Sequence, residues 1–206
     1  MRIIAGEFRG RKLLPPEGTD VTRPITDRVK QSLFDILAPL IPGAKVFDCF
    51  AGTGSLGLEC VSRGAESVWL YERDRSAANR LKRNIQTLGV KNALVLEGDV
   101  FQFVGTPVER QVAPAGSVDL VFLDPPYRFV RERPDQIVGL ARQLVSRFLA
   151  PDGVIVFRHD AKDRLTLPGV TTVDERTYGG MKLEFLRAPA TPPEGGDAVA
   201  GNEVNS

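Results

Sequence analysis

The sequence predicts an α/β fold, doubly wound around a mostly parallel, seven-stranded sheet. Short apolar runs alternate along the chain with segments whose apolar residues recur at helical spacing. Most runs are continuously apolar, which is typical of parallel strands that are buried on both faces. Glycines follow the first run of this alternation, as in a tight turn from a strand into a helix. Together these observations indicate strand–helix units around one parallel sheet.

The first segment of the chain precedes this alternation. Residues 2–14 are expected to form a small hairpin. Residues 26–38 carry apolar side chains at helical spacing, and Thr26 or Asp27 can cap the first turn of that helix. We therefore expect residues 1–24 to form an N-terminal β-hairpin extension.

The main domain is expected at residues 25–188. Its predicted strands lie at 45–49, 68–71, 93–96, 118–123, 153–157, 170–176 and 181–186. Its further helices are predicted at 56–61, 78–88 and 137–148. Gly89 can end the second of these in the left-handed conformation. The last two strands are close in sequence, so we expect them to pair antiparallel. Residues 189–206 are rich in Pro, Gly, Ala and acidic residues, which predicts a disordered tail.

The composition is typical of a soluble globular protein, with 42% apolar and 26% charged residues. No apolar run approaches the roughly 20 residues of a membrane span, and the N-terminus lacks the apolar region of a signal peptide. We therefore expect a cytoplasmic protein in which Cys49 and Cys60 are reduced. These two cysteines and His159 are too few for a zinc site, so no metal is expected.

Positive charge is concentrated near the N-terminus, although the net charge of the whole chain is only +1. A locally basic segment is compatible with a partner that carries a phosphate backbone, while solvated surface charge is the alternative. The candidates for phosphate contact are Arg9, Arg11, Lys12, Arg23 and Arg28.

A glycine-rich segment, residues 48–57, joins the first parallel strand to its helix. Gly52, Gly54 and Gly57 match the G-x-G-x-x-G pattern, in which glycines let a ligand approach the backbone and the helix pack on its strand. Asp48 ends the strand, and a carboxylate there disfavours a phosphate and favours a cation. S-adenosylmethionine carries an ammonium and a sulfonium but no phosphate, so it fits better than a dinucleotide. The alternative is a tight turn without a ligand.

Further candidates for cofactor binding follow the next two strands. Glu72 lies at nearly the spacing of about 20 residues at which a carboxylate binds ribose hydroxyls, although a solvated carboxylate is the alternative. Asp99 could accept a hydrogen bond from an adenine amino group and Val100 could pack on the ring, although a simple turn is the alternative. Phe50 and Arg73 are further candidates for cofactor binding.

The tetrapeptide Asp124-Pro125-Pro126-Tyr127 follows the fourth strand. Consecutive prolines cannot continue a sheet ladder, so the chain must turn, and their carbonyls are left as acceptors. This arrangement suits a planar base held by its exocyclic amino group: Asp124 and the Pro125 carbonyl would accept its hydrogens, and Tyr127 would stack on the ring. A Pro-Pro turn with a surface Tyr is the alternative. Because ligands bind at the carboxyl ends of such strands, we expect all these candidates to share one pocket.

These motifs resemble those of Rossmann-like class I S-adenosylmethionine-dependent methyltransferases, and more closely those of the RsmD family, which methylates the N2 of guanine in small-subunit (16S) ribosomal RNA. The resemblance covers about residues 1–187 and rests on residues 2–6, 9–13, 23–30, 48–59 and 124–127. Cys49 stands where the family usually has an apolar residue such as Leu, and residues 174–182 match the family poorly.

The resemblance implies S-adenosylmethionine as methyl donor, residues 124–127 as the catalytic motif, and ribosomal RNA, within the small subunit, as partner. It also implies that Arg23, Thr26 and Asp27 lie near the pocket. Two alternatives stay open. A DNA adenine-N6 methyltransferase uses a similar tetrapeptide but usually needs an added target-recognition region. A non-catalytic RNA- or nucleotide-binding domain could keep the fold. His159 is expected to be a polar residue after the fifth strand rather than a catalytic base.

Overall fold

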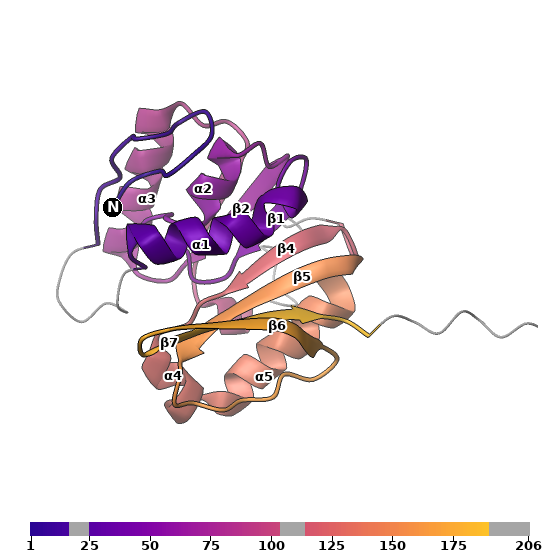
Figure 1. The fold of residues 1–206 in the computed structure, drawn as a ribbon. Helices are drawn as coiled ribbons and strands as arrows, with labels where there is room; N and C mark the ends of the chain where they lie inside the picture. The colour runs from indigo at the N-terminus through magenta and orange to yellow at the C-terminus, as the bar shows by residue number, and fades with distance from the viewer. Residues whose placement is uncertain (17–24, 104–113, 190–206) are drawn as a thin grey trace, which may run out of the picture.

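A single mixed sheet organises the chain. The computed structural model describes residues 1–16, 25–103 and 114–189. Seven strands lie in the order β3-β2-β1-β4-β5-β7-β6 (Figure 1). The strands from β3 to β5 are parallel to one another, and β7 runs antiparallel to both of its neighbours. The predicted doubly wound, mostly parallel sheet with an antiparallel last pair is therefore confirmed.

The elements follow one another as strands and helices in alternation. The strands are β1 Lys45–Asp48, β2 Ser67–Glu72, β3 Ala93–Glu97, β4 Val118–Leu123, β5 Leu149–Asp160, β6 Thr171–Tyr178 and β7 Met181–Arg187. The helices are α1 Asp27–Leu37, α2 Gly57–Ser62, α3 Arg75–Leu88, α4 Tyr127–Glu132 and α5 Pro134–Gln143. Short 3-10 turns lie at Ala38–Leu40 and Val100–Gln102, and a π-helical turn at Leu144–Phe148 follows α5. No helix of the described residues is long and apolar enough to cross a membrane.

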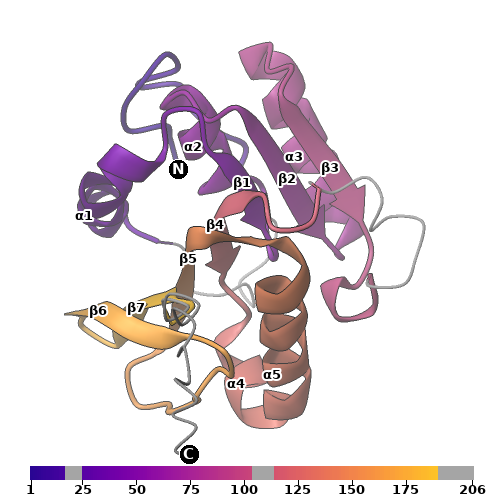
Figure 2. The same ribbon diagram turned by 90° about the vertical axis from the view of Figure 1, so that its right-hand side faces the viewer.

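Two hydrophobic cores lie on the two faces of the sheet. Helices α1, α2 and α3 cover one face, and α4 and α5 cover the other (Figure 2). Because successive side chains of a strand point to opposite faces, the central strands supply both cores. In β4, Leu120 and Phe122 belong to the core under α1–α3, whereas Val121 and Leu123 belong to the core under α4 and α5.

Local capping explains where the two longest helices, α1 and α3, begin and where α3 ends. The Thr26 hydroxyl accepts a hydrogen bond from the Val29 amide at 3.3 Å and starts α1. The Asp74 carboxylate accepts one from the Ala77 amide at 2.8 Å and starts α3. Gly89 has a φ of +73° and ends α3 in the left-handed conformation, as predicted.

Two stretches differ from the prediction. A helix, α4, begins at Tyr127 directly after the two prolines, because proline is tolerated where a helix starts. The fifth strand was predicted at 153–157 but runs from Leu149 to Asp160. Its second half is extended by antiparallel pairing with β7, in which His159 lies opposite Lys182. The expectation that His159 follows the strand was therefore wrong.

The N-terminal segment packs as part of the main domain. The predicted hairpin is reduced to one antiparallel bridge, between Arg2 and Lys12. Ile3 and Leu13 are buried in the core that also contains α1 and α2. The segment lies on the α1–α3 side of the sheet, in indigo in Figure 1. The predicted boundary at residue 24, the residue Arg23, and the tail from 190 onward lie outside the described residues.

Candidate active site

A cleft of about 760 Å³ lies at the carboxyl ends of the parallel strands. This volume is within the range of small-molecule sites, about 300–1,000 Å³. Residues that follow β1, β2, β3 and β4 all line it, so the strand-end candidates do share one pocket. The predicted residues in its wall are Asp48, Phe50, Gly52, Glu72, Arg73, Asp99, Val100, Asp124, Pro126 and Tyr127.

The other two glycines of the motif do not line the cleft. A Cβ at Gly54 would meet the side chains of Leu81 and Leu58, and one at Gly57 would meet that of Leu70. Gly57 therefore lets α2 pack closely on β2, which is the role that the pattern predicts for its last glycine, whereas Gly54 lets side chains of α2 and α3 approach the loop.

The remaining candidates with described positions lie outside the cleft wall, and Pro125 among them is buried. Thr26 caps α1, and its neighbour Ile25 lines the cleft. The other positions share exposure to solvent. They are Arg9, Arg11 and Lys12 on the N-terminal segment and Arg28 on α1.

Asp48 has the environment expected of a partner for a cationic ligand. Its side chain is 1% exposed, and Oδ2 accepts a hydrogen bond from the Gly57 amide at 3.3 Å. Its Oδ1 is buried and has no hydrogen-bond partner among the described residues. Burial, followed by the nearby charge of Asp124, raises the pKa of Asp48 to about 8. A ligand ammonium would supply the missing partner and favour the ionised carboxylate, so the site fits the amino-acid end of S-adenosylmethionine.

Glu72 holds the glycine loop in the structure. Its Oε2 accepts a hydrogen bond from the Gly52 amide at 2.7 Å, and its Oε1 accepts one from the Asp74 amide at 2.6 Å. Burial raises the pKa of Glu72 above its ordinary value. Glu72, the residue predicted to bind ribose hydroxyls, thus also sets the conformation of the glycine loop.

The third strand end supplies an apolar wall. Asp99 accepts a hydrogen bond from the Phe101 amide at 3.1 Å, which turns the chain so that Val100 and Phe101 face the cleft. The rings of Phe50 and Phe101 lie 5.7 Å apart, centroid to centroid. This wall suits a planar ring such as adenine, with Asp99 at its edge.

Asp124 is held by a residue that the sequence interpretation missed. The Arg158 Nε donates a hydrogen bond to Asp124 Oδ1 at 2.5 Å, and the two side chains are 6% and 11% exposed. The Arg158 guanidinium also lies 5.8 Å from the centroid of the Tyr127 ring. Burial raises the pKa of Asp124, and the charge and hydrogen bond of Arg158 oppose that rise. One signal in the sequence could have revealed Arg158. It is a basic residue in a buried strand, at a position that points to the same face of the sheet as the apolar residues Val154 and Val156.

Sequence and structure comparisons decide the family. The family described as "Conserved hypothetical protein 95" matches residues 1–187. The "Ribosomal RNA small subunit methyltransferase D" of Escherichia coli (strain K12) is 44% identical over 185 residues, which cover 88% of this chain and 86% of that protein. The chain belongs to this family of methyltransferases. The resemblance to the RsmD family is thereby confirmed.

Other relatives agree with this assignment. The protein of the same name from Haemophilus influenzae is 37% identical over 87% of this chain and 89% of its own length. The solved structure "Putative methyltransferase yhhF from Escherichia coli" superimposes with a TM-score of 0.78 at 34% identity, covering 93% of this chain and 99% of that one. The fold is that of the Rossmann-like class I methyltransferases.

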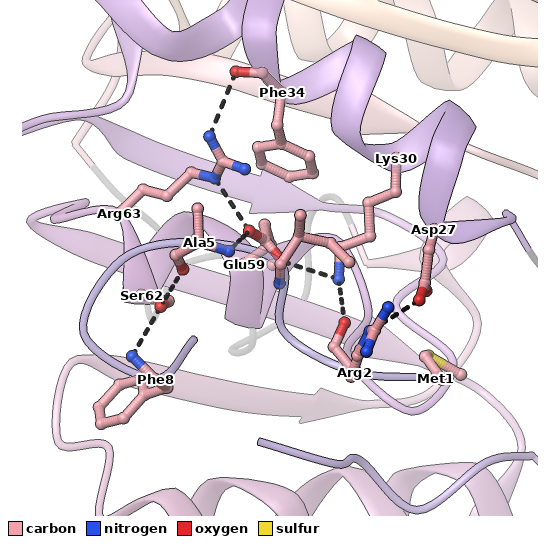
Figure 3. A network of polar contacts seen from close by, with 12 residues as sticks. Met1, Arg2, Ala5, Phe8, Asp27, Lys30, Phe34, Glu59, Ser62 and Arg63 are labelled. Carbon is pink, nitrogen blue, oxygen red and sulfur yellow. Dashed lines mark hydrogen bonds and ion pairs between the residues drawn. The ribbon is translucent and has the colours of Figure 1, made fainter. Parts of the chain in front are cut away.

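In this family member, Glu59 anchors the N-terminal segment (Figure 3). Its carboxylate accepts hydrogen bonds from the amides of Ile4 at 2.8 Å and Ala5 at 2.9 Å. It also forms ion pairs with Lys30 at 2.8 Å and Arg63 at 2.9 Å. A single buried carboxylate on α2 therefore joins the segment to α1 and α2. Sequence patterns predicted the helix but not this partner, because the contacts join residues that are far apart in the chain.

The N-terminal segment is also connected, through Asn84, to the glycine loop. The Leu14 amide donates a hydrogen bond to Asn84 Oδ1 at 2.8 Å, and Asn84 Nδ2 donates one to the Thr53 carbonyl at 2.9 Å. Thr53 and Met1 both line the cleft. The basic segment and the glycine loop of this methyltransferase are thus parts of one packed unit.

Proposed function

We propose that this protein transfers a methyl group from S-adenosylmethionine to the exocyclic N2 of a guanine in 16S ribosomal RNA of the small ribosomal subunit, in the cytoplasm. The observation that carries the proposal is the meeting of Asp48 and Asp124 in one cleft. Asp48 suits a cationic ligand, and Asp124 begins a motif suited to an amino group on a planar base. The name of the Escherichia coli relative supports ribosomal RNA as the substrate class.

Three strand ends, those of β1, β2 and β3, would hold the methyl donor. Asp48 would bind its ammonium, Glu72 its ribose hydroxyls, and Asp99 and Val100 its adenine. When bound, S-adenosylmethionine supplies an activated methyl group on a sulfonium. Because Asp48 and Asp124 line the same cleft, binding at these two residues would bring this methyl group and the target amino group together.

The catalytic motif would act by orienting the target. An aryl amine is a poor nucleophile because its lone pair is delocalised into the ring. By accepting its two hydrogens, Asp124 and the Pro125 carbonyl would aim that lone pair at the methyl carbon. Such positioning can lower a barrier by about 7–11 kcal/mol. Tyr127 would stack on the unstacked base, a contact worth about 1–3 kcal/mol.

No histidine base is required, because the alkylated nitrogen is strongly acidic and loses its proton after transfer. His159 lies in a different environment, between two neighbouring strands. Its Nδ1 lies 2.8 Å from the Asp160 carbonyl oxygen and its Nε2 lies 3.5 Å from Glu184 on the neighbouring strand β7. This histidine therefore belongs to the packing between β5 and β7.

Radiolabelled methyl transfer to small ribosomal subunits that lack the mark tests the proposal. The expected product nucleoside is N2-methylguanosine. N6-methyladenine in DNA would overturn the proposal in favour of a DNA methyltransferase, and calorimetric absence of S-adenosylmethionine binding would overturn it in favour of a non-catalytic domain.

The role of Asp124 is tested separately. Asp124→Ala should lower transfer by about 10²–10³-fold, the loss typical when one oriented polar group is removed from an active site. Cofactor affinity, measured calorimetrically, should stay close to that of the unaltered protein. An equal loss of transfer and cofactor binding would contradict the assigned role.

A further inference from the structure

Strand register places Arg158 beside Asp124. β4 and β5 are parallel, and their last paired residues are Leu123 and Phe157. Asp124 directly follows β4 and Arg158 is the next residue of β5, so the two side chains emerge next to each other at the carboxyl edge of the parallel strands. Both line the cleft. The pair is therefore built by the sheet itself and not by a surface loop.

Burial makes the pair strongly interdependent. A guanidinium that is 6% exposed is costly unless it is paired, and its partner here is the carboxylate of Asp124 at 2.5 Å. The charged and titratable groups around Asp124 are Arg158 on β5, Asp48 on β1 and Tyr127 on α4. Arg158 is the cation of this set and opposes protonation of Asp124.

We propose that Arg158 is a positioning residue for methyl transfer: it binds Oδ1 of Asp124 and thereby leaves Oδ2, ionised and aimed, as the acceptor for the target amino group. This inference rests on the proposed function. Among the described residues, Asp124 accepts a hydrogen bond from Arg158 alone. A protonated Asp124 would present a hydrogen-bond donor to the target amino group. The hydrogens of that amino group need an acceptor, and its lone pair is aimed at the methyl carbon. Arg158 would thus control both the direction and the charge of the acceptor.

The test compares Arg158→Met with Arg158→Lys. Arg158→Met should lower kcat for RNA methylation by about 10²-fold, with little change in KM for RNA or in S-adenosylmethionine affinity. The acid limb of its kcat–pH profile should move to higher pH, because Asp124 loses the charge that opposes its protonation. Arg158→Lys restores the charge without the planar guanidinium, so it should recover part of kcat and return the acid limb toward that of the unaltered enzyme.

Arg131→Met is a matched control. Arg131 pairs with Asp163 at 2.7 Å and with Asp160 at 3.3 Å, and it is not among the residues that line the cleft. Its loss should leave kcat and the pH profile unchanged. If Arg131→Met and Arg158→Met have equal effects, the role of Arg158 is merely structural and the inference is wrong.

A double-variant cycle keeps the test valid if Arg158→Met is unstable. In an Asp124→Asn background, Arg158→Lys should cause no further loss of single-turnover rate, because Arg158 acts through Asp124. Additive losses would overturn the inference. So would an effect confined to KM for RNA, which would indicate direct contact with the substrate. An unaltered enzyme that forms no N2-methylguanosine would instead refute the proposed function.

Discussion

The ammonium of Lys30 lies 2.8 Å from a carboxylate oxygen of Glu59, and the two side chains are 1% and 0% exposed. Burial lowers the pKa of Lys30, and Glu59 opposes that fall. The pair lies where α1, α2 and the N-terminal segment meet, since Lys30 also donates a hydrogen bond to the Arg2 carbonyl at 3.0 Å. This buried ion pair is therefore one of the contacts that attach the N-terminal segment to the domain.

Glu59→Gln should destabilise the protein by about 3–5 kcal/mol, because Lys30 would remain as a buried, uncompensated charge. Urea-induced unfolding measures the change. Arg2→Gln is the control: it removes the exposed ion pair of Arg2 with Asp27, which should cost less than about 1 kcal/mol. Equal losses in the two variants would show that the buried pair does not anchor the segment.

Gly6→Ala should weaken docking of the N-terminal segment more than Gly10→Ala does. Both glycines have left-handed φ values, +82° and +81°. That conformation costs a non-glycine residue about 1–2 kcal/mol. A Cβ at Gly6 would also overlap the Ser62 carbonyl, whereas nothing lies within 4 Å of one at Gly10. Hydrogen exchange of the Phe8 amide, which is bonded to Ser62 Oγ at 2.9 Å, reports docking. Similar exchange rates in the two variants would contradict the clash.

S-adenosylmethionine should bind more tightly as pH rises toward 8. Because the pKa of Asp48 is about 8 in the free protein, its carboxyl is mostly protonated at pH 7. An ammonium ligand requires the ionised form, so binding releases a proton. The dissociation constant should fall about tenfold per pH unit well below pH 8 and reach a minimum near pH 8, above which the ligand ammonium itself loses its proton. Calorimetry in buffers of different ionisation enthalpy measures the released proton. Adenosine, which lacks the ammonium, is the control, and an equal pH dependence for both ligands would contradict this role of Asp48.

Replacing Arg9, Arg11 and Lys12 together by Gln should reduce the salt dependence of kcat/KM on ribosomal RNA. If each contacts one phosphate, the slope of log(kcat/KM) against log[salt] should fall in magnitude by about 2. Substitution is preferable to deletion, because Ile3 and Leu13 of the same segment belong to the core. Arg142→Gln removes an exposed charge on α5, on the opposite face of the sheet, and should leave the slope unchanged. An unaltered slope in the triple variant would exclude phosphate contact by this segment.

Much of the fold could be predicted because its signals are local. The start of α1 and the end of α3 follow from Thr26 and Gly89, whose side-chain or backbone preferences act within one turn of the chain. The site was predictable to the same extent. Asp48 and Asp124 each end an apolar run, and parallel strands bring such ends to one edge of the sheet.

The sequence by itself determined the order of strands and helices and which side chains stand at the strand ends, since hydrophobic periodicity and turn residues act over a few neighbours. Only the tertiary structure decided the partners of those side chains. The pairing of β4 with β5 places Arg158 against Asp124, and the packing of α1 on α2 buries Lys30 against Glu59. Register and helix packing depend on shape and burial between segments that are distant in sequence. These long-range contacts therefore position Asp124 and the N-terminal segment.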